Sequence, residues 1–280
     1  MGAVFEPIKP YIGSIVHVSK DEMFTEEVAR QCREMLDERT VLVFPRANLT
    51  DAEQLAFTDL MGARVDFTTR QKANQTAAED VYQVTLDKKI NRQPEYVLGT
   101  FFWHMDGITV DMPPPKASLL SARKVAAKGG QTEFASTAAA YDHLPEAEKA
   151  ELKGLRAVHS VAASLSPIAD AIPEEDRERV TSIGLVKEHP IVWQRESGRT
   201  TMVIGTTADT VVGMPVAHGR ALLHRLTEWA AQPDFSYRHQ WEEGDFVVWD
   251  NTAAMHRVIP YDDTGRMMHR TSVAGTEAVS

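Results

Sequence analysis

The feature that most constrains this chain is a histidine and an aspartate two positions apart, His104 and Asp106, within an aromatic stretch. On an extended strand, residues i and i+2 project from the same face, so an imidazole and a carboxylate would stand side by side. Most His-x-Asp pairs are only hydrogen-bonded or solvated. Here, however, apolar residues at 97–103 precede the pair, and a buried carboxylate is costly unless it is paired or binds a metal. The stretch therefore predicts a metal-binding pair at the end of a buried strand.

A second histidine, His256, lies far along the chain within a predicted strand at 255–259, which follows another predicted strand at 245–249. Together with His104 and Asp106 it completes a set of two histidines and one carboxylate. Such a set binds Fe(II) on one triangular face and leaves three positions open for chemistry. We therefore predict an Fe(II) site. A non-catalytic metal-binding module and a hydrolytic zinc site are the alternatives, although no additional general base is evident for the latter.

Two arginines, Arg266 and Arg270, follow the third predicted ligand. If both lie in one strand, their separation of four residues places them on the same face. Guanidinium groups bind carboxylate or sulfonate in a bidentate manner. One arginine can then hold an acidic co-substrate and the other an acidic substrate. The alternative is that both are surface charges, but their position beside His256 and an apolar strand favours the first interpretation.

Composition limits the partners of the chain. The formal net charge is −10, which argues against nucleic acid, because a phosphate backbone requires a basic surface. No apolar run approaches the roughly 18 residues that span a bilayer, and the N-terminus lacks the pattern of a signal peptide. The single cysteine, Cys32, has no internal disulfide partner. We therefore expect a cytoplasmic protein without a membrane or nucleic-acid partner.

Hydrophobic periodicity predicts one domain spanning residues 1–280, mainly β with flanking helices, in which the ligands meet inside a jelly roll. Residues 67–95 are predicted to be irregular, and 158–179, where the pattern is weak, to be partly loop. A loop of this length is typical of a lid or binding loop, so 67–103 is interpreted as a substrate-pocket loop, with a solvated surface segment as the alternative. The predicted strands lie at 11–18, 41–45, 117–125, 129–135, 191–194, 200–204, 246–249, 255–259 and 269–275, and the predicted helices at 25–39, 50–62, 136–155 with a break at Pro145, and 215–231.

The sequence resembles that of a known family. Motifs along nearly its whole length are similar to those of the taurine dioxygenase / 2,4-dichlorophenoxyacetate dioxygenase family, whose members are non-haem, Fe(II)- and 2-oxoglutarate-dependent enzymes. The C-terminal motifs are most similar to the aryloxyalkanoate-degrading branch. The resemblance implies a double-stranded β-helix, a cupin-like jelly roll. The motifs, in family order, are VLVFP, AFTDLMG, WHMDG, ASLLSARKV, GGQTEFAS, WDNTAAMHRVIPYD and RMMHRTSVAGTE.

The resemblance also implies a cofactor, Fe(II), and two co-substrates, 2-oxoglutarate and O2. Oxidative decarboxylation of 2-oxoglutarate releases succinate and CO2 while a C–H bond of the substrate is hydroxylated. Related halogenases have a small residue in place of the ligand carboxylate, so a carboxylate at Asp106 favours hydroxylation. The implied roles are iron ligation by His104, Asp106 and His256, binding of the distal carboxylate of 2-oxoglutarate by Thr132 and Arg266, and binding of the substrate by Arg270.

The implied substrate is a small anion such as an aryloxyalkanoic acid, which hydroxylation often cleaves. A taurine-like sulfonate or an alkyl sulfate is the alternative. Most family members have threonine or serine between the first two ligands, whereas this chain has Met105, so the substrate side of the pocket does not follow the family pattern. Relatives are often dimers or tetramers, and we expect a homo-oligomer.

Overall fold

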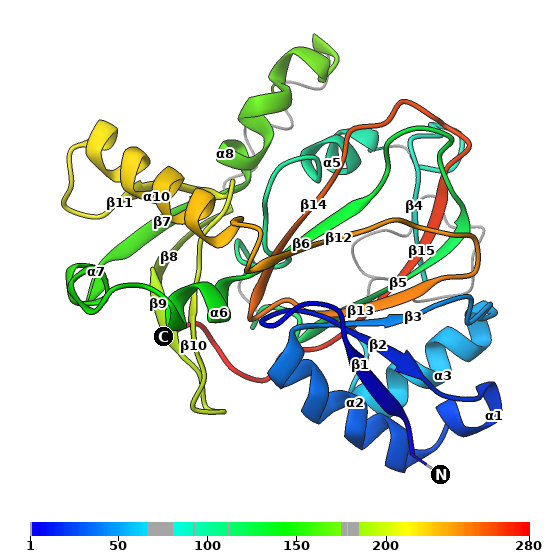
Figure 1. Cartoon of the computed structure of the whole chain (residues 1–280). Coiled ribbons are helices and arrows are strands. Elements are labelled where there is room, and N and C mark those ends of the chain that lie inside the picture. The colour runs from blue at the N-terminus through cyan, green and yellow to red at the C-terminus, as the bar shows by residue number, and fades with distance from the viewer. Residues whose placement is uncertain (1, 66–80, 92, 111–112, 175–177, 179–184) are drawn as a thin grey trace.

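The computed structural model describes residues 2–65, 81–91, 93–110, 113–174, 178 and 185–280. These residues form mainly β structure with helices packed around the sheets, as predicted (Figure 1). The largest sheet has the strand order β1-β2-β3-β13-β5-β15-β4, and all its neighbouring pairs are antiparallel except β2–β3. Its strands are β1 (Val4–Pro7), β2 (Ser14–His17), β3 (Val41–Phe44), β4 (Tyr82–Val84), β5 (Ala117–Lys124), β13 (Phe246–Asp250) and β15 (Met267–Val273).

A second, antiparallel sheet has the order β12-β6-β14, formed by Ser236–His239, Thr132–Ser136 and Ala254–Val258. A cluster of buried side chains joins it to the largest sheet. In this cluster the ring of Phe134 in β6 lies 5.4 Å from that of Trp249 in β13, and Leu120 and Met268 take part from β5 and β15. The two sheets therefore share one apolar core.

The side chains of strand β13 belong to two different apolar clusters. Val247 and Trp249 belong to the cluster between the two sheets, whereas Phe246 and Val248 belong to a cluster that includes residues of helices α2 (Glu26–Arg39) and α3 (Asp51–Met61). Successive side chains of a strand point to opposite faces. The uninterrupted apolar run of β13 is thus explained, because both of its faces are covered.

The helices on the outer face begin at the residues that the sequence predicts. Thr25 caps α2 by accepting a hydrogen bond from the backbone N–H of Val28. Thr50 and Glu53 form a reciprocal capping box at the start of α3. Cys32 lies buried on α2 as a free thiol, and Lys20–Met23 form the short helix α1. None of the helices in the described part of the chain combines the length and apolar composition that a bilayer crossing requires.

A further group of elements lies between β6 and β12 in the sequence and packs around its own apolar cluster, which includes Trp193 and Leu226. Met105 and Ile108 join this cluster, so the group contacts the segment that carries Asp106. Its elements are α6 (Thr137–Asp142), α7 (Glu146–Leu152), β7 (Arg156–Ser160), α8 (Val161–Leu165), the 3-10 helix η1 (Ser166–Ala171), β8 (Val186–Pro190), β9 (Val192–Gln194), β10 (Thr200–Met202), β11 (Ala208–Val211) and α10 (Val216–Ala230).

Two segments for which the sequence predicted an irregular or partly looped chain contain short regular elements. Within 67–95 the described residues include β4 and the start of helix α5 (Pro94–Gly99), while 67–80 and 92 lie outside the described residues. Within 158–179 the chain forms part of β7, α8 and η1. These elements are only three to six residues long, which is too short for periodicity to reveal them.

Candidate metal centre

The two predicted histidine ligands lie opposite each other in an isolated antiparallel bridge. His256 belongs to β14, whereas His104 follows α5 in a short extended segment. The backbone N–H of each histidine donates to the carbonyl oxygen of the other, at 3.0 and 2.9 Å. Directly opposed residues project their side chains from the same face, and the two ring centroids are 4.1 Å apart. The structure thus brings together two imidazoles that are far apart in the sequence.

Asp106 adds a carboxylate to this pair from a turn, so the prediction of a strand running through both His104 and Asp106 is wrong. Asp106 Oδ1 lies 3.8 Å from His104 Nε2, and Oδ2 lies 3.9 Å from His256 Nε2. One ligand atom from each of the three residues lies within 4.8 Å of the others. The side chains that the sequence singles out therefore converge on one point.

Burial determines the protonation states of these three groups. It lowers the pKa of His104, and it lowers that of His256 to about 3. Burial alone would raise the pKa of Asp106, but Arg270, the two imidazoles and a hydrogen bond from Ser118 outweigh it, so the pKa lies below its ordinary value. The folded protein thus presents two neutral imidazoles and one carboxylate, which are the forms that bind a metal.

The tautomer of His104 leaves a lone pair on the nitrogen that faces Asp106. His104 Nδ1 lies 2.8 Å from the carbonyl oxygen of Phe102, which can only accept, so Nδ1 carries the proton and Nε2 is free. Two nitrogens and one carboxylate oxygen suit Fe(II). Such donor atoms form bonds of about 2 Å with zinc. Two donor atoms bound to one ion are therefore at most about 4 Å from each other. The separations of 3.8 and 3.9 Å meet this limit, and the residues fit the ion.

Arg266 is a buried cation that has no carboxylate partner among the described residues, and it is only 2% exposed. Its Nη2 donates to the carbonyl oxygen of Gly130 at 3.1 Å, and its guanidinium carbon lies 4.7 Å from the ring centroid of Tyr261. Burial lowers its pKa. A buried charge is costly unless an opposite charge compensates it, so this position suits an anionic ligand.

Thr132 lies on the same face of the second sheet as His256. In the pairing of β6 with β14, Phe134 is opposite His256 and Thr132 is opposite Val258. The threonine is therefore two residues, about 7 Å, from His256 along the strands. Its hydroxyl accepts a hydrogen bond from Trp241 Nε1 at 2.9 Å, which leaves the hydroxyl hydrogen available to a ligand.

Arg270 lies beside the triad in β15. Its Nη1 is 3.5 Å from Asp106 Oδ2, and its guanidinium carbon is 5.2 Å from the ring centroid of Tyr82 in β4. Arg266 precedes β15, so the two arginines do not lie within one regular strand, and the geometry that would place them on one face does not apply. Met105, by contrast, is 2% exposed and packs in the cluster with Trp193, away from the triad.

Several polar residues around the centre were not predicted. Ser118 contacts Asp106, Asn251 contacts Ser118, and Trp241 contacts Thr132. The signal for Ser118 is a small polar residue inside the apolar strand β5, and Asn251 belongs to the WDN sequence at the end of β13.

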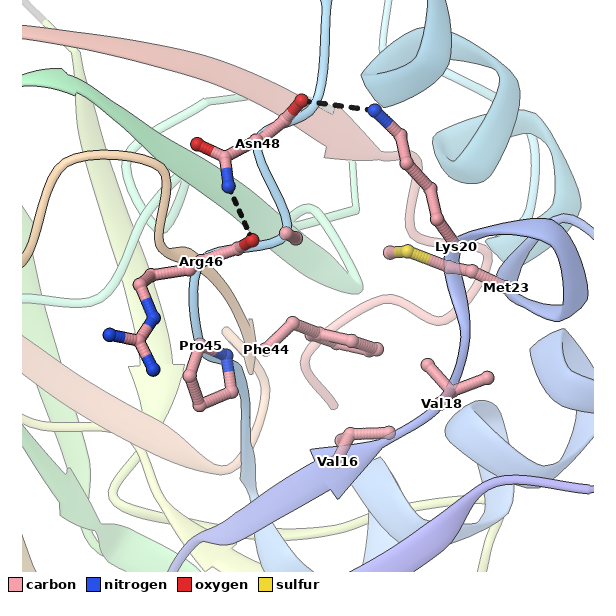
Figure 2. Close-up of a pocket in the computed structure, with 9 residues that line it drawn as sticks. Val16, Val18, Lys20, Met23, Phe44, Pro45, Arg46 and Asn48 are labelled. Carbon is pink, nitrogen blue, oxygen red and sulfur yellow. Dashed lines mark hydrogen bonds between the residues drawn. The ribbon is translucent and has the colours of Figure 1, made fainter.

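A separate hollow lies on another part of the molecule (Figure 2). It contains none of the predicted site residues, so it does not bear on the metal centre. Its lining consists of Val16, Val18, Lys20, Met23, Phe44, Pro45, Arg46, Ala47 and Asn48.

Comparison with known proteins agrees with this geometry. Residues 5–272 match the model of the family described as taurine catabolism dioxygenase TauD, TfdA family. The chain belongs to the TauD/TfdA dioxygenase family. This confirms both the predicted family and the prediction of an enzyme with dioxygenase chemistry.

Individual members of the TauD/TfdA family match over most of the chain. An alpha-ketoglutarate-dependent 2,4-dichlorophenoxyacetate dioxygenase from Cupriavidus pinatubonensis is 35% identical, with 100% of both chains covered. An (S)-phenoxypropionate/alpha-ketoglutarate-dioxygenase from Sphingobium herbicidovorans is 33% identical, over 86% of this chain and 84% of the relative. The crystal structure of AAD-2 with Mn(II) and N-oxalylglycine superposes with a TM-score of 0.80 at 30% identity, covering 99% of each chain.

Proposed function

We propose that this chain hydroxylates a small anionic molecule, such as an aryloxyalkanoic acid, at an Fe(II) ion held by His104, Asp106 and His256. The enzyme is 2-oxoglutarate-dependent (2-oxoglutarate is alpha-ketoglutarate), and it uses O2 and releases succinate and CO2. The observation that carries the proposal is the convergence of two neutral imidazoles and one carboxylate within 4.8 Å. When bound, Fe(II) would supply the open positions at which O2 reacts, while the electrons for its reduction come from 2-oxoglutarate and the C–H bond of the substrate.

The protein itself contributes binding and orientation. We assign the distal carboxylate of 2-oxoglutarate to Arg266 and Thr132. The cation is buried without a carboxylate partner among the described residues, and the threonine hydroxyl retains a free hydrogen. A guanidinium group and a hydroxyl group can together satisfy both oxygens of a carboxylate, and both side chains are buried.

Arg270 is assigned to the anionic group of the substrate. Its place between Asp106 and Tyr82 supports this role, since a substrate held there lies next to the metal. Tyr82 belongs to the segment 67–103, which we propose as a wall of the substrate pocket. Phenoxy relatives favour an aryloxyalkanoic acid, with a sulfonate or alkyl sulfate as the second candidate.

We further propose that the two facing sheets are the two faces of a double-stranded β-helix, and that residues 1–280 act as one domain. The shared core supports both points, because it combines residues from Ile12 near the N-terminus to Met268 in β15. A homo-oligomeric state and a cytoplasmic location stay predictions.

Anaerobic titration of the protein with Fe(II) and 2-oxoglutarate tests the proposal. The weak visible charge-transfer band of the iron-bound 2-oxoglutarate chelate is expected in the wild type, lost in His104→Ala and weakened in Arg266→Ala. Arg220→Ala, which removes an exposed arginine paired with Asp209, is the matched control and is expected to retain the band. A folded wild type without the band contradicts the proposal and favours a metal-binding module. Succinate release with phenoxyacetate, taurine and an alkyl sulfate in parallel then distinguishes the substrates.

A further inference from the structure

A buried hydrogen-bond chain leads to the carboxylate of Asp106. Ser118 Oγ donates to Asp106 Oδ2 at 2.9 Å, and Asn251 Nδ2 donates to Ser118 Oγ at 2.8 Å. Ser118 and Asn251 are both 0% exposed. Neither residue is among those predicted to contact the metal, 2-oxoglutarate or the substrate. The two hydrogen bonds therefore need a separate explanation.

The direction of these two hydrogen bonds follows from the number of hydrogens that each group can donate. A serine hydroxyl has one hydrogen to donate, and an ionised carboxylate can only accept. The hydrogen of Ser118 is therefore committed to Asp106. The amide of Asn251 must then present its NH2 to Ser118, because an amide oxygen at that place would compete for the same hydrogen. In the order amide, hydroxyl, carboxylate, each of the two contacts thus has one donor and one acceptor.

Both donors are attached to well-anchored backbone. Ser118 lies in β5, where it is opposite Trp249 of β13 on one side and Ser272 of β15 on the other. Asn251 follows β13 directly, and its backbone N–H donates to the carbonyl oxygen of Lys116 at 3.0 Å. Strands paired on both sides are among the most stable parts of a fold. The hydroxyl of Ser118 is therefore presented at a constant place, whereas Asp106 itself lies in a turn.

The two oxygens of Asp106 have different surroundings. Oδ2 accepts the hydrogen bond from Ser118 and lies 3.5 Å from Arg270 Nη1 and 3.9 Å from His256 Nε2. Oδ1 has no hydrogen bond from any described residue and lies 3.8 Å from His104 Nε2. We propose that Ser118 and Asn251 are positioning residues that hold Oδ2, so that Oδ1 is the single carboxylate oxygen offered to the metal. This inference rests on the proposed metal site.

Binding of Mn(II) to the metal-free protein, followed through the EPR signal of free Mn(II), tests the proposal without turnover. Ser118→Ala is expected to weaken binding by about 10- to 100-fold, the usual effect of losing a hydrogen-bond partner of a ligand. Ser118→Thr keeps the hydroxyl and is expected to restore most of the affinity. Asn251→Ala keeps the hydroxyl but removes its donor, and is expected to weaken binding severalfold even if Ser118→Ala does not fold.

The matched control is Ser272→Ala. Ser272 is a buried serine on the neighbouring strand, and its Oγ lies 3.5 Å from that of Ser118. This variant is expected to bind Mn(II) like the wild type. If folded Ser118→Ala and Asn251→Ala both bind as tightly as Ser272→Ala, the positioning role is wrong. If the wild type binds no Mn(II), the metal site itself is wrong, so failure of this inference is distinguishable from failure of the proposed function.

Discussion

His104 and His256 hold each other in place through their main chains, with two backbone hydrogen bonds of 3.0 and 2.9 Å between them. Their imidazoles therefore share one face by strand geometry alone, before any side-chain packing is considered. The carbonyl of Trp103, the residue before His104, accepts from the backbone N–H of Thr206 at 2.7 Å. The position of the proposed metal centre thus depends on close backbone contacts of Trp103 and His104.

Gly205 is expected to be essential for this backbone contact. A Cβ at this position would lie 2.8 Å from the carbonyl oxygen of Trp103 and 3.3 Å from His104 Cα, and its φ is +111°. We expect Gly205→Ala to lower the free energy of unfolding by about 2–4 kcal/mol, since positive φ alone costs about 1–3 kcal/mol and the clash adds to it. Mn(II) binding should weaken as well. Urea unfolding and Mn(II) titration measure the two effects.

The control for that prediction is Gly213→Ala. Gly213 also has a positive φ, +77°, but a Cβ there meets nothing within 4 Å. The free energy of unfolding of this variant should fall by only about 1 kcal/mol, and its affinity for Mn(II) should equal that of the wild type. Equal Mn(II) affinity in the two variants would show that the contact with Trp103 does not position the ligand.

Replacing Arg266 by methionine should separate stability from binding. We expect the ligand-free protein to become more stable by about 1 kcal/mol, because a buried cation is exchanged for an apolar side chain of similar length. The affinity for 2-oxoglutarate should fall about 100-fold or more, since loss of one partner of a buried charge pair costs about 3–5 kcal/mol. Calorimetric titration of the metal-loaded protein checks this, with Arg220→Met as the control. An unchanged affinity would remove Arg266 from the proposed site.

Replacing Arg270 by glutamine should affect the substrate and not the co-substrate. Loss of a charge-assisted hydrogen bond costs about 1.5–3 kcal/mol, so the KM for an anionic substrate is expected to rise about 10- to 100-fold. The 2-oxoglutarate affinity should stay within about twofold of the wild type. Succinate release at varied substrate concentration measures the first quantity. A rise in the KM for 2-oxoglutarate instead would mean that the two arginines have exchanged roles.

His159 should make the protein less stable in mild acid. It is fully buried, and burial, with a smaller contribution from His189, lowers its pKa from 6.5 to about 3. Between these pH values the unfolded chain binds a proton that the folded chain does not, so stability falls as the pH falls. Between pH 7 and pH 5.5 this one group should lower the free energy of unfolding by about 1 kcal/mol.

Urea unfolding of the wild type and of His159→Gln at both pH values checks this expectation. The decrease in the free energy of unfolding between pH 7 and pH 5.5 should be about 1 kcal/mol smaller in the variant. The exposed His224, replaced in the same way, is the control. If His159→Gln and His224→Gln show the same pH dependence as the wild type, His159 does not take part in the acid sensitivity.

Much of the fold and the site could be predicted because the relevant patterns are local. The apolar run of β13 and the capping residues Thr25 and Thr50 determine their elements within a few positions. His104 and Asp106 were recognisable through their residue types and spacing. Their common location was predicted correctly although the predicted strand is wrong.

What escaped prediction depends on contacts that are distant in the sequence. His104 is extended because it pairs with His256, and no pattern around residue 104 carries that information. The three residues of β4 form a strand because β15 offers them an edge. Likewise, the roles of Ser118 and Asn251 become visible only when three strands place them beneath Asp106.

The bridge between His104 and His256 has a consequence for biosynthesis. During translation the N-terminal ligand pair is made first, while the segment 107–255, which contains β5, β6, β12 and β13, still has to be synthesised. The backbone partner of His104 does not exist until β14 has left the ribosome. A nascent chain that stops before residue 256 therefore carries two of the three proposed ligands and lacks the backbone partner of His104.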